Sequence, residues 1–234
     1  MKKAFVSLFS VIMIAVLLAT SVNASVNKVL ERESNRIPLI VIDAGHGGFD
    51  GGCIGIDGSY EKDINLEISL KLNSLLQNLG FETLLIRSKD VSVETKGSSI
   101  REKKKSDINN RFSYMSKHPG CVYLSIHQNQ YSASSVKGAQ MFYTPDNYKS
   151  KLLAQHIQDN VATNVQKDNN RKIKPCTKDV YIIHHAPEES TAVLIECGFL
   201  SNNSDLQNLK DSDYQLKMCS AISFGVLDWL KDAS

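Results

Sequence analysis

The sequence lacks the features that mark several common classes of protein. The first 24 of its 234 residues carry two lysines and no acid, so the rest holds 25 basic and 25 acidic residues and no formal net charge. A chain with no net charge lacks the excess of positive charge by which proteins bind nucleic acid. Internal repeats, low-complexity tracts and a second domain are also missing, and the length suits one domain with a sizeable core.

The cysteines are too few and too irregular to define a scaffold. There are five, an odd number, and no pair has zinc-finger or redox spacing. We therefore expect no disulfide framework, although a single bridge remains compatible with the pattern. Cys121, Cys197 and Cys219 lie in apolar segments and are predicted to be core residues. We predict no catalytic cysteine.

The first 24 residues have the pattern of an export segment. Lys2 and Lys3 precede an uncharged run over 4–19, and the small residues that end at Ala24 offer a cleavage point. This pattern is typical of a secretory signal peptide. An uncleaved N-terminal membrane anchor is the alternative, because the run is only slightly short of the ~17–25 residues of a membrane helix. Either interpretation predicts export across the cytoplasmic membrane.

After a polar linker over 25–36, strands and helices are predicted to alternate in one domain, residues 37–232. The apolar runs expected in the sheet are 38–45, 81–87, 121–127, 139–144, 180–185 and 191–196. The expected helices are 61–79, 107–117 with Asp107 as N-cap, 149–165 and 212–231. Residues 88–106, with their basic run 101–105, are predicted to be a solvated loop. The fold class is α/β, a mainly parallel twisted sheet of about six strands with helices on both faces.

Three side chains capable of chemistry lie at the ends of predicted strands. His46 follows the first strand, and His127 and Glu196 end two later ones. Functional groups of α/β sheets collect beyond the carboxyl ends of the strands, so these three are expected at one edge. Glu61 begins the first helix, and the glycine-rich loop 47–60 can fold that helix start back over the same edge.

Two histidines and a glutamate with an open position suit a catalytic zinc site. Zinc accepts imidazole nitrogen and carboxylate oxygen at about 2.0–2.2 Å, and it lowers the pKa of a bound water to near 7. Glu196 is placed to take a proton from that water. A histidine at a strand end is often only a hydrogen-bonded structural residue. Glu61 at a helix start can be explained by its favourable interaction with the helix dipole. A purely structural role explains Glu196 less well, because an unpaired buried carboxylate is costly.

Four ordered segments carry a resemblance to a known family: VIDAGHGGFDGG, YEKDINLEISLKL, SIHQN and LIECGFLSN. They resemble the zinc-dependent N-acetylmuramoyl-L-alanine amidases, type 3, over about residues 37–231. The resemblance implies one zinc ion per chain on His46, Glu61 and His127, with Glu196 as the catalytic glutamate. The implied reaction is hydrolysis of the amide between the lactyl group of N-acetylmuramic acid and the L-alanine of the stem peptide.

Other residues also match the family or lie near the predicted edge. Asn129 is a candidate for orienting substrate or a ligand, with capping of the following turn as an equal alternative. Arg111 matches a family position and is interpreted as a structural tie to nearby carboxylates. His184 and His185 are interpreted as loop histidines rather than ligands.

The chain shows neither the wall-binding repeats nor the autoinhibitory insert of many family members. In this it resembles the spore-cortex branch, which strips stem peptides so that muramic-δ-lactam can form, a mark read during germination. That resemblance predicts a protein partner that recruits the enzyme or helps order its zinc site. The alternatives are a general autolysin in cell separation, a zinc peptidase cutting within the stem peptide, and a non-catalytic muropeptide-binding module. Glu196 argues against the last, since a pure binder needs no general base.

Overall fold

The computed structural model describes residues 37–233, and the predictions for residues 1–36 lie outside this part. The strands are β1 (Ile40–Ala44), β2 (Thr83–Leu85), β3 (Val122–Asn129), β4 (Gln140–Tyr143), β5 (Lys174–Pro175) and β6 (Thr191–Phe199). The helices are α2 (Glu61–Asn78), α3 (Ile100–Lys117), α4 (Tyr148–Asn164), α5 (Tyr181–His184), α6 (Asn203–Lys210) and α7 (Ser212–Ala233). Within residues 37–233, none of the helices combines the length and apolar character needed to cross a membrane.

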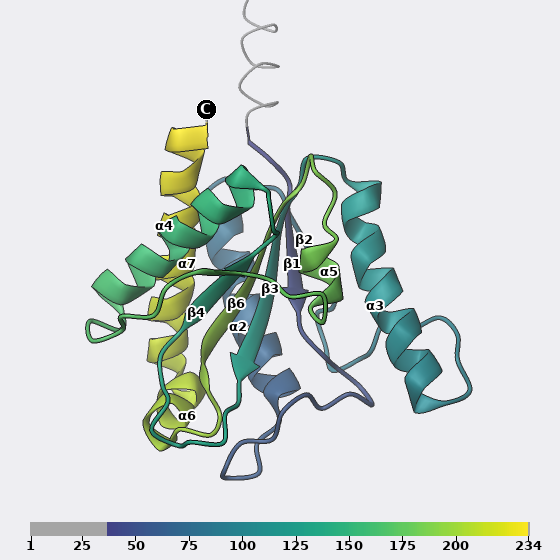
Figure 1. The fold of residues 1–234 in the computed structure, drawn as a ribbon, viewed down its shortest axis with the longest axis horizontal. Coiled ribbons are helices and arrows are strands. Elements are labelled where there is room, and N and C mark those ends of the chain that lie inside the picture. Colours follow the sequence, from purple (N-terminus) through teal and green to yellow (C-terminus); the bar gives the residue numbers. More distant parts are fainter. Residues whose placement is uncertain (1–36, 234) are drawn as a thin grey trace, which may run out of the picture. The chain divides into compact units, whose positions relative to one another are not determined.

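The strands form one mainly parallel sheet in the order β2-β1-β3-β6-β4-β5 (Figure 1). The pairs of β1 with β2, β1 with β3, and β3 with β6 are parallel, whereas β4 runs antiparallel to β6. His127 of β3 is in register with Glu196 of β6. The predicted α/β fold class is confirmed, and two of the predicted site residues end neighbouring parallel strands.

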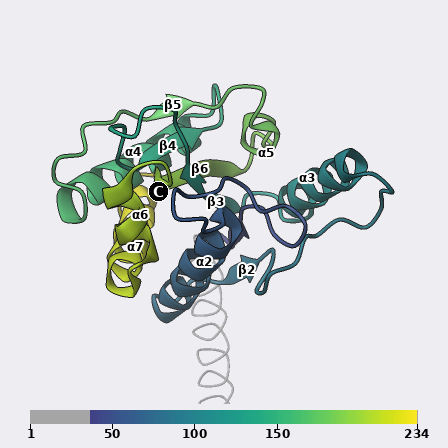
Figure 2. The same cartoon turned by 90° about the horizontal axis from the view of Figure 1, so that it is seen from below.

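Each face of the sheet has its own hydrophobic core. On one face, Ile40 and Ile42 of β1 pack with apolar residues of α2, α4, α6 and α7. On the other face, Val41 packs with Met115 of α3 and Ile183 of α5. Figure 2 shows α3 and α5 set apart from α6 and α7. The alternation along β1 is that of a strand buried on both sides, and helices cover both faces as predicted.

Helix α3 begins at Ile100 and not at the predicted Asp107. Ser99 is its N-cap, and a reciprocal capping box joins Ser99 to Glu102. The capping box satisfies N–H groups that a helix start leaves free. The basic run 101–105 is therefore the first part of a helix and not a solvated loop. Asp107 lies inside the helix and accepts the Val93 N–H at 2.8 Å.

The segment 180–185 is also not a strand. It contains the short helix α5, in which only Ile183 is buried. The edge position beside β4 is taken instead by β5, and the Cys176 N–H donates to Tyr143 O at 2.9 Å. A single buried apolar residue is typical of one helical turn, whereas a strand would place alternate residues on the buried face.

Helix α6 was not predicted from the sequence. Its signals are an Asn202 cap, whose side chain accepts the Asp205 N–H, and the buried pair Leu206 and Leu209 three residues apart.

The three cysteines predicted to be core residues are buried, which confirms that prediction. The five cysteines are free thiols.

Arg111 ties α3 to the end of β1. Its guanidinium pairs with the buried Asp43 and with Asp107, and it donates to Ala44 O at 2.9 Å and to His46 O at 2.6 Å. Burial raises the pKa of Asp43, but the charges of Arg111 and His127 and the hydrogen bonds from Tyr123 and Arg111 together outweigh burial, and the pKa stays below its usual value. The interpretation of Arg111 as a structural tie is confirmed.

We expect Arg111→Met to lower the free energy of unfolding by about 3–5 kcal/mol, because Asp43 is then left buried without its counter-charge. Denaturant unfolding measures the change. Lys105→Met, which removes an exposed charge from the same helix, is the control and is expected within about 0.5 kcal/mol of wild type. Equal stability of the two variants would contradict a structural role for Arg111.

Candidate metal centre

Three predicted ligands meet at one point although they are far apart in the sequence. One ligand atom from each of His46, Glu61 and His127 lies within 4.8 Å of the other two. Glu61 Oε2 is 3.2 Å from His46 Nε2, and Glu61 Oε1 is 2.9 Å from His127 Nδ1. Two imidazole nitrogens and a carboxylate oxygen around one position are a donor set that suits zinc.

His46 is held in an unusual backbone conformation just after β1. Its φ of 62° lies in the left-handed region, which costs a non-glycine residue about 1 kcal/mol or more. The bond from Arg111 to its carbonyl stabilises this conformation. Asp50 Oδ2 lies 3.0 Å from His46 Nδ1, so Nε2 is the nitrogen that faces Glu61. A carboxylate behind a ligating imidazole is a common way to orient it.

Glu61 is only 1% exposed and is held by donors from three segments. Its Oε2 accepts the Cys53 N–H at 2.8 Å. Its Oε1 accepts the Gln128 N–H at 3.1 Å and the Asn65 Nδ2 amide at 3.2 Å. Because Asn65 is one turn along α2 from Glu61, its spacing of four residues was a readable signal that the sequence analysis missed. Asp50, four residues after His46, was missed in the same way.

Two glycines allow the side chains of the cluster to approach the backbone. A Cβ atom at Gly45 would lie 2.3 Å from the His127 ring, and one at Gly52 would lie 2.5 Å from Glu61 Oε2. Either distance is far inside van der Waals contact. The glycines in this loop therefore do more than form a turn, because they make room for the cluster.

Charges within the cluster shift the pKa values of its members in opposite directions. Burial lowers the pKa of His46, but hydrogen bonds to Asp50 and Glu61 outweigh burial and raise it to about 9. Burial raises the pKa of Glu61, but the two imidazoles outweigh it and hold the pKa well below its usual value. Glu61 is thus held as a carboxylate that attracts positive charge. A divalent cation can supply that charge in place of the protons.

Glu196 has a different environment from Glu61. Its Oε2 is buried and has no hydrogen-bond partner among the described residues. Burial, opposed by His127 and reinforced by the charge of Glu61, raises the pKa of Glu196 to about 7. A carboxyl with a pKa near neutral can both accept and return a proton.

The remaining predicted residues lie outside this cluster. Asn129 Oδ1 accepts the Gln130 N–H at 2.8 Å, a local contact that fits the turn-capping alternative. His184 Nδ1 lies 3.1 Å from Cys176 O, and His185 Nδ1 lies 3.0 Å from Tyr181 O. Neither histidine is among the three residues that meet at the metal position.

Comparisons with known proteins show the family to which this chain belongs. A family model for N-acetylmuramoyl-L-alanine amidases, type 3, matches residues 40–228, so the chain belongs to this family of peptidoglycan hydrolases. The germination-specific N-acetylmuramoyl-L-alanine amidase of Bacillus subtilis is 31% identical over 195 residues, which are 83% of this chain and 80% of that protein. The amidase LytC of the same organism is 34% identical over 194 residues, 82% of this chain but 35% of LytC.

A solved structure is also similar over the same part of the chain. The CwlD amidase from Clostridioides difficile, in complex with the GerS lipoprotein, is 38% identical with a TM-score of 0.79. The match covers 83% of this chain and 99% of that one. The mostly parallel sheet with its helices is therefore the fold of this amidase family.

We expect Gly45→Ala to lower the affinity for Zn²⁺ by at least about tenfold, because the added methyl group would displace the His127 ring. Gly58→Ala is the control for backbone strain in the neighbouring loop, because its φ of 86° disfavours alanine while a Cβ atom there meets nothing within 4 Å, and its affinity for Zn²⁺ should stay near that of wild type. Titration with Zn²⁺ against a chromophoric chelator measures both affinities. An unchanged affinity in Gly45→Ala would show that the ring position does not matter for metal binding.

Proposed function

We propose that this chain is a zinc-dependent amidase that cleaves the bond between N-acetylmuramic acid and the L-alanine of the stem peptide. His46, Glu61 and His127 hold one zinc ion, and Glu196 is the catalytic residue. The observation that carries this proposal is the convergence of the three ligand atoms within 4.8 Å, beside a carboxyl in register with His127. The family match supports the bond that is cleaved.

Each residue of the centre has a distinct task in this reaction. Zinc, when bound, supplies a Lewis acid that activates water and polarises the amide carbonyl. Glu196 accepts the proton of the attacking water at Oε2 and returns it to the leaving nitrogen of L-alanine. Asp50 orients the His46 ring, and Asn65 orients the Glu61 carboxylate. Asn129, at the end of β3, is a candidate contact to the substrate.

The biological role that the relatives support is maturation of the spore cortex. One relative is named as germination-specific, which supports a role in the spore. In the role that we propose, removal of stem peptides lets muramic-δ-lactam form. A role outside the spore, as a general autolysin, is the second candidate, because LytC, an amidase whose name does not specify germination, is similarly identical over this domain. A muropeptide-binding module and a peptidase of the stem peptide are the remaining alternatives.

We also propose that this chain acts outside the cytoplasmic membrane and that it has a protein partner. Residues 1–24 act as a signal peptide or membrane anchor, residues 25–36 as a linker, and residues 37–232 as the catalytic domain on the cell-wall or cortex side of the membrane. The CwlD amidase was solved with a lipoprotein, which supports a protein partner for this chain that recruits it or helps order its zinc site.

Purified protein with Zn²⁺ should release free stem peptides that begin with L-alanine from intact sacculi, as identified by mass spectrometry. Glu196→Gln should retain one zinc per chain but lose about 10²–10⁴-fold in turnover, because the proton acceptor is gone. Glu188→Gln, an exposed carboxyl, is the control. Cuts only between amino acids would exclude the amidase, and full activity of Glu196→Gln would exclude its role.

For the spore role, deletion of the gene should remove muramic-δ-lactam from the cortex, because the lactam needs a muramic acid freed of its peptide. Composition analysis of digested cortex measures this. Complementation with Glu196→Gln should fail, and complementation with Glu188→Gln should succeed. Spores with normal lactam after deletion would instead favour the autolysin.

A further inference from the structure

The row of side chains that begins with His127 and Glu196 continues onto a third strand. Gln140 of β4 lies opposite Glu196 in the antiparallel pair. Directly opposed residues stand on the same face of a sheet, with Cβ atoms about 4.5–5.5 Å apart. Gln140 is 3% exposed. This buried amide therefore lies beside the proposed catalytic carboxyl, on the side away from the metal ligands.

Gln140 positions the guanidinium of Arg171. Its Oε1 accepts bonds from Arg171 Nε at 3.3 Å and Nη2 at 2.9 Å. Its own Nε2 donates to Lys172 O at 2.6 Å, which fixes the orientation of the amide. The Arg171 guanidinium carbon also lies 4.8 Å from the centroid of the Phe199 ring. The guanidinium is thus held on two sides, by an amide and by an aromatic ring.

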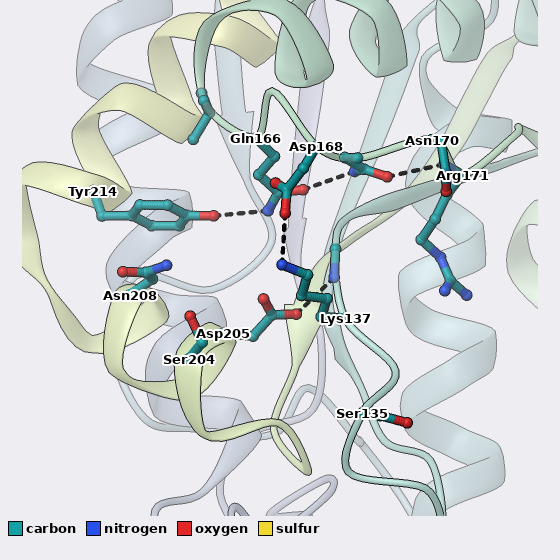
Figure 3. Close-up of a pocket in the computed structure, with 13 residues that line it drawn as sticks. Ser135, Lys137, Gln166, Asp168, Asn170, Arg171, Ser204, Asp205, Asn208 and Tyr214 are labelled. Atoms are coloured by element: carbon teal, nitrogen blue, oxygen red, sulfur yellow. Dashed lines mark hydrogen bonds and ion pairs between the residues drawn. The ribbon is translucent and has the colours of Figure 1, made fainter.

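The segment that carries Arg171 is fixed to the sheet as well. Asn169 Nδ2 donates to Ala139 O at 2.9 Å, and Asn169 Oδ1 accepts the Arg171 N–H at 3.0 Å. Arg171 is one of the residues that line a polar pocket of about 380 Å³, in which its guanidinium is turned away from the Lys137–Asp168 pair (Figure 3). Arg171 is therefore ordered before any ligand arrives.

Within the part of the chain that the structure describes, the charge of Arg171 has no acidic partner. Among residues 37–233, no carboxylate forms an ion pair with it, and its Nη1 donates no hydrogen bond. Arg111, in contrast, pairs with two carboxylates, and Arg87, which has no ion pair among residues 37–233, donates from Nε, Nη1 and Nη2 to backbone carbonyls. Because a guanidinium is a planar fork of donors that matches a carboxylate, this arrangement leaves a free half of the fork for an anionic ligand.

We propose that Arg171 binds a free carboxylate of the stem peptide and so selects substrates by their peptide part. This inference rests on the proposed amidase function. The lactyl carboxyl of N-acetylmuramic acid is consumed in the amide that is cleaved, so the free carboxylates of the substrate lie on the peptide. Gln140 links Arg171 to the strand position opposite Glu196, so an anion bound by Arg171 would lie on the side of the residue that returns the proton to the leaving nitrogen. The neutral Gln140 holds the arginine without cancelling its charge.

The test uses two short glycan strands that differ only in the stem peptide, with its carboxylates either all free or all converted to carboxamides. We expect the zinc-loaded wild-type chain to prefer the free form in kcat/KM by roughly 10- to 100-fold, the range for a charged hydrogen-bond pair. Arg171→Gln should lose this preference and keep its activity on the carboxamide form. Arg171→Lys should recover part of the preference.

Lys172→Gln is the matched control, because it removes an exposed positive charge one residue away and should keep the preference. Equal cleavage of both substrates by wild type, or an equal loss on both in Arg171→Gln, would overturn the inference while the amidase function stands. If zinc-loaded wild type releases L-alanine peptides from neither strand, the proposed function fails and this inference falls with it. Zinc content and thermal unfolding confirm that each variant is folded.

Discussion

The buried carboxylate of Glu61 is the constraint on which the rest of the site depends. A carboxylate with 1% exposure is costly unless positive charge and donors surround it. The chain supplies two imidazoles, two backbone N–H groups and the Asn65 amide. These come from the loop after β1, from β3 and from α2 itself. Satisfying one carboxylate therefore fixes the relative positions of three segments, and it leaves a local excess of negative charge where a cation can bind.

The loop that carries His46 needs separate support, because its carbonyls lie beyond the sheet. Arg87 donates to Ala44 O at 2.8 Å and to Gly45 O at 3.0 Å, and Arg111 donates to His46 O. Two arginines thus hold three successive carbonyls, from the last residue of β1 into the loop. Asp43 balances the charge of Arg111 from within the sheet. The network explains how a residue with positive φ can be held well enough to orient an imidazole.

The sequence was sufficient for the sheet and for the position of the site, because apolar runs identify strands and parallel strands bring their ends together. His46, His127 and Glu196 needed no more than this, and Glu61 needed only the start of a helix. The start of α3 was missed because the charged run 101–105 was interpreted as a loop, although Ser99 is a typical helix N-cap. The segment 180–185 was misread because four apolar letters do not distinguish a strand from one helical turn. Asn65 and Asp50 lie four residues from the ligands they contact, a local signal that was overlooked, whereas Arg171 contacts Gln140 across 31 residues, which periodicity does not record.

Glu61 and Glu196 show how one fold gives the same side chain opposite electrostatic environments. Glu61 is surrounded by donors and stays ionised, whereas Glu196 has an oxygen without any donor and a pKa raised to about 7. Pairs of titratable groups whose environments separate their pKa values are typical of acid–base catalysis. The separation here follows chiefly from burial, which raises the pKa of Glu196 where no donor offsets it. Strand register brings His127 of β3 to one side of Glu196 and the neutral amide of Gln140 of β4 to the other. An acidic or basic residue in place of Gln140 would shift the pKa of Glu196, so the neutrality of the third member of the row suits the proposed proton transfer by Glu196.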